Sequence, residues 1–315
     1  MLAFAAQASR RAPDNLPGAR MIPFVRKLEF EYGRVDQVSP LIRRVVADNP
    51  GPFTYLGTGT YIVGRGEVAV IDPGPDMADH LDALLAAVAG ERVTHILTTH
   101  THADHSPLAH PMAARTGATV IGRASPGALQ AVLELDEPGE GEFKPDVEVG
   151  DGQLIRGPGW TLEAIATPGH ISNHVCYGLH EENALFSGDH VMGWSTTVIS
   201  PPHGDMSDYY ASLDKVAARG FATLWPTHGP PVTDVAPFLA AYKAHRLDRE
   251  RQILAELAKG PRRIADMVPV MYAAVEARLH PAAAHSVFAH LIHMVRQGQA
   301  ATDGAPTPDG VYRLA

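Results

Sequence analysis

The sequence predicts a layered α/β domain followed by a smaller helical module. In the first two thirds of the chain, short apolar runs alternate with stretches of helical periodicity, which is typical of strands that pack beneath helices. From about Ala240 the periodicity becomes helical, and two short extended pieces follow around Asp303-Gly304 and Asp309-Gly310. Three helices followed by a hairpin indicate the winged form of a helix-turn-helix module.

The individual elements follow from the apolar runs and from the turn residues between them. A buried run at 67–71 ends at the turn Asp72-Pro73-Gly74, and an amphipathic stretch at 77–89 ends at Gly90. We expect strands at residues 53–63, 67–71, 93–98, 118–121, 160–166, 174–179, 184–187 and 223–225. We expect helices at residues 77–89, 107–116 and 207–218 and, in the C-terminal module, at 240–258, 261–272 and 282–297.

These elements divide the chain into a flexible tail at 1–20, an α/β domain at 21–240 and a winged-helix-like domain at 241–315. In the tail, arginines follow the apolar start, which reverses the charge order of a secretory signal. No apolar run approaches the eighteen or so residues of a membrane span. Cys176 is the one cysteine of the sequence, so no intrachain disulfide can form. We therefore expect a cytoplasmic protein without a membrane partner.

Charge is divided unevenly along the chain. Residues 243–315 carry ten Lys or Arg and seven Asp or Glu, a net charge of +3, whereas residues 1–242 carry 16 basic and 28 acidic residues, a net charge of −12. The larger part is therefore a poor general binder of polyanions, and the C-terminal part is mildly basic.

The strongest chemical signal is the run THTHADH at residues 99–105, directly after the strand expected at 93–98. Neutral imidazole and carboxylate groups are zinc ligands, and a catalytic zinc leaves one position open for water. His100 and His102, two residues apart on an extended turn, can share one metal. Asp104 and His105 lie one step further along the loop and can reach a second metal.

Three later motifs place the same ligand types at the ends of expected strands. TPGH ends at His170, SGDH contains Asp189 and His190, and PTHG contains His228. A histidine beside a glycine is by itself more often an ordinary loop residue. Loops that follow strands at one edge of a sheet are, however, where an α/β active site forms. The motifs and the cluster together therefore predict one metal site.

The sequence also resembles a known family. HTHADH, TPGH, SGD and THG, preceded by DPGPD, resemble the signature motifs of the metallo-β-lactamase superfamily. THADHSP, TPGHISNH, FSGDHVMGWSTTVISPPHGDM and the helical C-terminal module are similar to the beta-lactamase-like protein 2 family, over roughly residues 20–315. The resemblance implies a four-layer αββα sandwich with a dinuclear metal centre and a winged-helix-like C-terminal domain. Ser106-Pro107 replaces the two glycines common in thioesterases of the glyoxalase II type, which weakens a glutathione-thioester substrate.

The resemblance further implies a role for each ligand. It assigns one metal to His100, His102 and His170, the other to Asp104, His105 and His228, and the bridging position to Asp189. We expect two zinc ions per chain, although these ligands also accept manganese or iron. A metal-bridging hydroxide would then attack the substrate. Asp104 is either a ligand alone or also the proton acceptor for the attacking water.

Other residues near the motifs are candidates for supporting roles. We expect Asp72 to orient a ligand or loop without touching metal. His174 and His190 flank ligands, and for both a structural role is favoured over a role in substrate binding. His203 is a candidate for the substrate entrance, and the tyrosines at 209 and 210 are more simply explained by packing. The histidines at 285, 290 and 293 lie on the last expected helix without a ligand pattern that indicates a metal site, and we interpret them as surface or packing residues.

The sequence leaves the substrate open. The first possibility is an endoribonuclease-like phosphodiesterase that acts on single-stranded RNA, and the alternative is a hydrolase of a small carboxyl derivative, namely a thioester, lactone or β-lactam. The basic residues of the C-terminal module, Arg262, Arg263, Arg278 and Arg296, lie among acidic neighbours and form no strong basic stripe. A metal-sensing regulator that binds nucleic acid is a third possibility, which the complete ligand set disfavours. Self-association of the chain is also possible.

Overall fold

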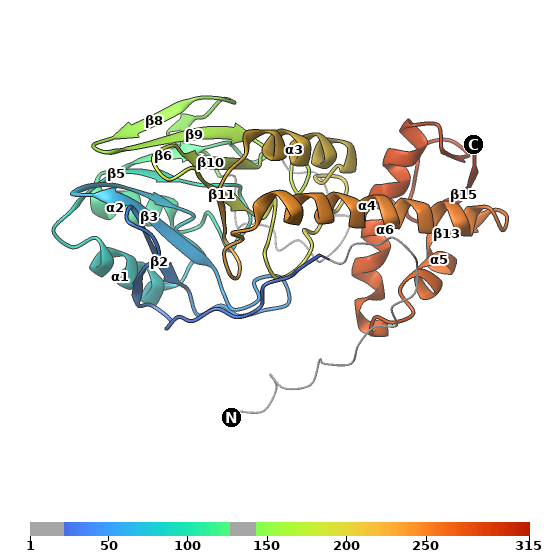
Figure 1. The fold of residues 1–315 in the computed structure, drawn as a ribbon, viewed down its shortest axis with the longest axis horizontal. Coiled ribbons are helices and arrows are strands. Elements are labelled where there is room, and N and C mark those ends of the chain that lie inside the picture. Colours follow the sequence, from blue (N-terminus) through green and yellow to red (C-terminus); the bar gives the residue numbers. More distant parts are fainter. Residues whose placement is uncertain (1–21, 127–142) are drawn as a thin grey trace. The chain divides into compact units, whose positions relative to one another are not determined.

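The computed structural model describes residues 22–126 and 143–315, so the tail expected at 1–20 lies outside the described residues. The chain divides into two compact units, one of Ile22–Lys243 and another that contains Ala244–Ala315. Both are visible in Figure 1. Among the described helices, none combines the length and the apolar character that a membrane crossing requires.

The first sheet of the larger unit has seven strands in the order β1-β2-β3-β4-β5-β6-β7. Their bounds are β1 Val35–Gln37, β2 Ile42–Val46, β3 Gly59–Arg65, β4 Glu67–Ile71, β5 Arg92–Leu97, β6 Thr119–Gly122 and β7 Val147–Glu148. The strands from β1 to β4 pair antiparallel, and those from β4 to β7 pair parallel. Parallel neighbours need a crossover connection, which helices α1 (Ala78–Ala87) and α2 (Ala109–Thr116) provide for the first two pairs.

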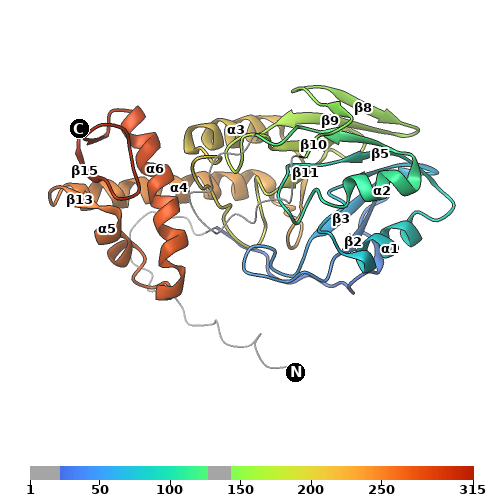
Figure 2. The same cartoon turned by 180° about the vertical axis from the view of Figure 1, so that it is seen from behind.

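The second sheet has five strands in the order β12-β11-β10-β9-β8. Their bounds are β8 Leu154–Gly157, β9 Trp160–Ala166, β10 Val175–Leu179, β11 Ala184–Gly188 and β12 Thr223–Pro226. Helix α3 (Met206–Arg219) connects β11 to its parallel neighbour β12 and lies along this sheet in both views (Figures 1 and 2). The O–H of Ser212 on α3 donates to the carbonyl of Pro168, next to the end of β9.

Alternating side chains give the first sheet two apolar faces. On β3, Tyr61 and Val63 point into a core that also contains Phe186 and Trp225 of the second sheet. Ile62, between them, belongs to a separate cluster that includes Leu84 of α1 and Met112 of α2. Because successive residues of a strand face opposite sides, one sheet can bury both a sheet and a layer of helices. The arrangement is the expected αββα sandwich.

The C-terminal unit consists of helices with a small sheet. Its elements after α4 (Val235–Leu257) are β13 Arg262–Arg263, α5 Ile264–Met271, the 3-10 helix η1 Ala277–Leu279, α6 His280–Arg296, β14 Ala300–Thr302 and β15 Val311–Leu314. The three strands pair in the order β13-β15-β14. Met267, Phe288, Leu291 and Tyr312 belong to a core of this unit's own. This is the winged-helix architecture that the sequence predicted.

The first sheet departs from the sequence expectations at β3 and at β2. The strand expected at 53–63 begins only at Gly59, and turns occupy the residues before it. Gly57 has φ +116°, and a Cβ there would lie 2.1 Å from the carbonyl oxygen of Ala47, so only glycine permits this path. Strand β2 was not predicted because two arginines interrupt its apolar pattern. Both are buried, and the Arg43 guanidinium lies 2.6 Å from the Glu91 carboxylate.

Candidate metal centre

The predicted ligands meet because the strands that precede them end at the same edges. In the first sheet β4 and β5 are parallel, so Asp72 and the 99–105 loop leave the sheet together. In the second sheet β9, β11 and β12 run in one direction, so their ends carry His170, Asp189 and His228 to one edge. The two edges are joined by a bridge between Thr58 and His228. The topology therefore gathers ligand loops that are far apart in the sequence.

Three histidines form the first potential metal-binding group, namely His100, His102 and His170. Nδ1 of His102 lies 2.9 Å from Nε2 of His100 and 3.1 Å from Nε2 of His170. Ligand atoms about 2 Å from one tetrahedral zinc lie about 3.3 Å from each other, so these separations are compatible with a shared ion.

The second potential group consists of Asp104, His105 and His228. Oδ2 of Asp104 lies 3.0 Å from Nε2 of His228 and 3.5 Å from Nε2 of His105. The carboxylate therefore faces both imidazoles, as a common metal ligand would.

Asp189 lies between the two groups. Its Oδ1 is 3.7 Å from Nε2 of His105 and 3.5 Å from Nε2 of His228, whereas its Oδ2 is 4.0 Å from Nε2 of His170. One carboxylate oxygen thus faces each group, which is the geometry that a bridging ligand requires.

The buried polar atoms of this site fit a metal. Nε2 of His105, Nε2 of His228 and Oδ1 of Asp189 are buried and have no hydrogen-bond partner. Buried polar atoms without partners are costly, and convergence of three of them within a few ångströms is explained if they share a cation. A divalent metal would satisfy all three atoms at once.

In three of these imidazoles, the ring nitrogen that points away from the site has a fixed partner. Nδ1 of His105 lies 2.9 Å from Oδ2 of Asp72, Nδ1 of His170 lies 2.6 Å from the carbonyl oxygen of Val198, and Nδ1 of His228 lies 3.2 Å from the carbonyl oxygen of Gly57. Because these oxygens only accept, each Nδ1 carries a proton, and Nε2 is the nitrogen left to bind a metal. The three hydrogen bonds thus orient Nε2 of each ring toward the site.

Asp72 connects two segments that carry predicted ligands, the 99–105 loop and the turn before His228. Its Oδ1 accepts from the backbone N–H of Thr99, and its Oδ2 accepts from the hydroxyls of Thr99 and Thr227 as well as from His105. The carboxylate is completely buried, and it contacts the His105 ring at Nδ1, the nitrogen that points away from the site. Asp72 therefore holds together the loops that carry the predicted ligands.

Burial and neighbouring charges divide the histidines into two kinds. Burial lowers the pKa of His100 and His102 well below the ordinary value, and the neighbouring imidazoles lower it further, so both are neutral. Burial also acts against the charged form of His105, but the carboxylates of Asp104, Asp72 and Asp189 outweigh it and raise its pKa to about 10. Three carboxylates thus create a strongly negative potential at one buried point, which favours a cation.

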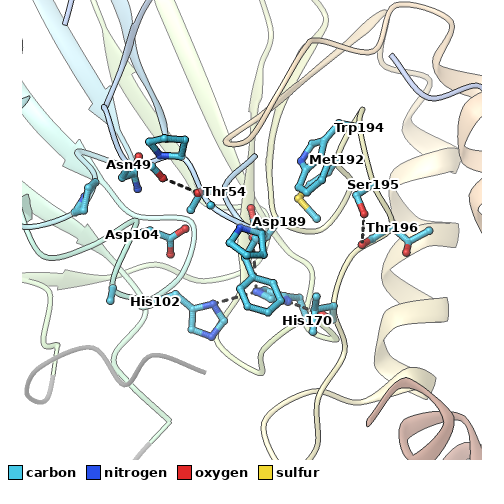
Figure 3. A pocket seen from close by; sticks show the side chains of 17 residues that line it. Asn49, Thr54, His102, Asp104, His170, Asp189, Met192, Trp194, Ser195 and Thr196 are labelled. Atoms are coloured by element: carbon cyan, nitrogen blue, oxygen red, sulfur yellow. Dashed lines mark hydrogen bonds and ion pairs between the residues drawn. The ribbon is translucent and has the colours of Figure 1, made fainter. Parts of the chain in front are cut away.

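The site opens into a cavity of about 550 Å³ (Figure 3). His102, Asp104, His170 and Asp189 form part of its wall. Two loops contribute most of the other lining residues. They are Asn49, Pro50, Gly51, Pro52, Phe53 and Thr54 of the first loop, Met192, Trp194, Ser195, Thr196 and Val198 of the second, and Pro75 and Ala103.

The two cavity loops were not predicted from the sequence. Residues 50–54 carry two prolines and a glycine, a turn signal that was available in the sequence, but the apolar residues after them favoured a strand. The stretch after His190 has no periodicity that would reveal which side chains face a cavity.

The supporting candidates differ in their positions. Nε2 of His174 accepts a hydrogen bond from the backbone N–H of Asp189 at 3.2 Å, and its Nδ1 pairs with Thr167. His190 is buried, packs edge-on to Tyr209 and does not line the cavity. His203 is half-buried and is not among the cavity-lining residues either.

Comparison with known families identifies the class. A model of the metallo-beta-lactamase superfamily matches residues 55–228, and a model of the beta-lactamase associated winged helix domain matches residues 264–307. The chain therefore belongs to the metallo-beta-lactamase superfamily and is a metal-dependent hydrolase with a C-terminal winged-helix domain.

Individual relatives and structures agree with this assignment. An atrochrysone carboxyl ACP thioesterase from Aspergillus chevalieri is 34% identical over 226 residues, which cover 71% of this chain and 68% of that protein. A beta-lactamase-like protein 2 homolog from Caenorhabditis elegans is 32% identical, with coverage of 71% and 73%. A metallo-beta-lactamase family protein from Thermus thermophilus shares the fold with a TM-score of 0.72 and 23% identity, over 89% of this chain and all of that one. A beta-lactamase domain protein from Burkholderia ambifaria shares the fold with a TM-score of 0.75 and 18% identity, over 96% of each chain.

Proposed function

We propose that this protein is a dinuclear zinc hydrolase that cleaves a thioester. The observation that carries the proposal is the composition of the cavity wall beside the metal-binding groups. No lysine or arginine occurs among the described residues that line it, and its charged carboxylates are Asp104 and Asp189. A site for a polyanion would need cationic contacts to phosphate, so the wall favours an uncharged carboxyl derivative over RNA.

The leaving group supports a thioester among carboxyl derivatives. A thiol has a pKa of about 8.5 and departs as a thiolate without a strong acid. The described lining of the cavity offers hydroxyls of Ser and Thr but no tyrosine, lysine or glutamate that could donate a proton to a poorer leaving group. The names of related proteins, which include an ACP thioesterase, agree with this choice.

The chemistry then divides between metal and protein. When bound, a metal pair lowers the pKa of a shared water from about 15.7 toward neutrality and polarises the substrate carbonyl. Asp104 belongs to the second potential metal-binding group and also lines the cavity, which supports assigning to it the role of proton acceptor for a water molecule there. Asp72 accepts from Nδ1 of His105 and so directs Nε2 of that ring toward the site, and His174 fixes the backbone of Asp189.

One experiment tests this function. The full chain, with its metal content measured, is assayed side by side on an acyl thioester, a lactone, nitrocefin and single-stranded RNA. We expect thioester hydrolysis that is lost with a chelator and restored by Zn²⁺. We expect His100→Ala to be inactive, whereas His110→Ala, an exposed histidine on α2, serves as the matched control and remains active. Cleavage of RNA without hydrolysis of any carboxyl substrate would overturn the proposal.

Binding measurements address the winged-helix domain separately. Its residues 244–315 are only mildly basic. We therefore expect no gel shift of single-stranded RNA or DNA at about 50–100 mM salt, the range in which contacts to phosphate show.

A further inference from the structure

The cavity beside the metal-binding groups has two opposing walls. Loop 49–54 contributes one and loop 192–198 the other, and Figure 3 shows Asp189 between Thr54 and Trp194. His102, Asp104 and His170 line the same cavity. A carbonyl carbon positioned at the ligands must therefore have its substituent between the two loops.

Both loops contribute large apolar side chains to the cavity. Phe53 lies on the first loop, and Met192, Trp194 and Val198 lie on the second. The side chain of Phe53 is 42% exposed, so much of its apolar ring surface faces water. A group that lies between these walls gains free energy by removing the apolar surface from water.

Trp194 is held rigidly in its wall. Its ring stacks on Tyr55 with 4.5 Å between centroids and 10° between planes, and the O–H of Tyr55 donates to the carbonyl of Arg26 at 2.7 Å. Behind the ring lies Gly229, where a Cβ would be 2.8 Å from Cδ1 of Trp194. Because these contacts hold the ring in place, Trp194 is a fixed part of its wall, and a fixed wall selects by size and shape.

We infer that the acyl part of the substrate is a bulky apolar group, bound between Phe53 and Trp194, and that these two side chains determine acyl specificity. This inference rests on the proposed thioester hydrolysis. A volume of about 550 Å³ exceeds the need of an acetyl group and falls in the range of pockets for drug-sized ligands. The charged part of a carrier or cofactor thiol must lie outside, because the described wall has no cation to bind it.

The test compares acyl groups on one leaving group. The zinc-loaded full chain is assayed on N-acetylcysteamine thioesters of acetate, octanoate and 2-naphthoate. The quantity compared is the ratio of kcat/KM for the naphthoyl thioester to kcat/KM for the acetyl thioester. We expect the ratio to exceed about tenfold in the parent and to fall about tenfold in Phe53→Ala and in Trp194→Ala, since each removes apolar contact to the acyl group. Trp194→Phe keeps an aromatic wall and should retain most of the ratio.

Controls separate specificity from folding. Tyr32→Ala removes another exposed aromatic residue outside the cavity and should leave the ratio unchanged. All variants are compared at equal metal content, because Gly229, against which Trp194 packs, adjoins the ligand His228. An equal kcat/KM for acetyl and naphthoyl in the parent, or unchanged ratios in both alanine variants, would overturn the inference while thioester hydrolysis stands. If none of the three thioesters is hydrolysed, the proposed function is overturned and the inference with it.

Discussion

Replacement of Asp72 by asparagine tests whether this buried carboxylate organises the metal centre. The carboxylate accepts four hydrogen bonds at 2.7–2.9 Å, one through Oδ1 and three through Oδ2. Asparagine has nearly the same shape but one acceptor oxygen. If its N–H₂ replaces Oδ1, it faces the N–H of Thr99. If it replaces Oδ2, it faces Nδ1 of His105 and favours the tautomer that protonates Nε2.

The magnitude follows from the bonds that are lost. A hydrogen bond to a charged group contributes about 1.5–3 kcal/mol. Loss of at least one such bond, together with one unsatisfied donor, should lower the free energy of unfolding of the metal-free protein by about 3 kcal/mol. Changes behind metal ligands usually weaken metal affinity by about 10- to 100-fold, and we expect this for the group that contains His105.

Two measurements check the prediction. Titration calorimetry with Zn²⁺ gives the affinity and stoichiometry, and urea unfolding of the metal-free protein gives the stability. Asp76→Asn is the matched control, because Asp76 is exposed in the same loop. An Asp72→Asn variant that binds two zinc ions with the parent's affinity would refute the role that we assign to Asp72.

Three further predictions concern stability and the role of His190. Gly64→Ala should lower the free energy of unfolding by about 2–3 kcal/mol more than Gly66→Ala, because both glycines have positive φ but only a Cβ at Gly64 would meet Trp160, at 2.4 Å. Thermal unfolding of the two variants gives the difference, and equal losses of stability would contradict the packing argument. Burial lowers the pKa of His80 to about 4. The unfolded chain therefore binds a proton at His80 near pH 6.5, whereas the folded chain binds it only near pH 4. The free energy of unfolding falls by about 3 kcal/mol as the pH drops from 6.5 to 4. Urea unfolding of metal-free His80→Gln should show a shallower pH dependence than the parent, and an identical one would exclude His80 as a cause. His190→Phe should retain zinc binding and kcat/KM within a few-fold, since this buried ring packs on Tyr209 away from the cavity; a loss of about 100-fold or more at full metal content would show that His190 takes part in the reaction.

Much of the fold was readable from local patterns. Strand β4 at Glu67–Ile71 and strand β9 at Trp160–Ala166 have the predicted bounds, because a short apolar run between turn residues is a local signal. Strand β2 was not predicted, since its arginines are neutralised by Glu91 and Asp36, which come from other parts of the chain. The polar residues of β2 therefore argued against a buried strand, although ion pairs compensate their charges in the fold.

The sequence by itself determined the ligand types and the strand ends on which they lie, because imidazoles and carboxylates after strands mark such a site. Only the tertiary structure decided that His102 faces the site through Nδ1 and the neighbouring imidazoles through Nε2, and that Asp189 has one oxygen toward each group. It also decided that loops 49–54 and 192–198 form the cavity wall. The reason is physical: the direction of a side chain in a loop depends on hydrogen bonds and stacking with residues remote in sequence, such as Tyr55 on Trp194, and no periodicity encodes these contacts.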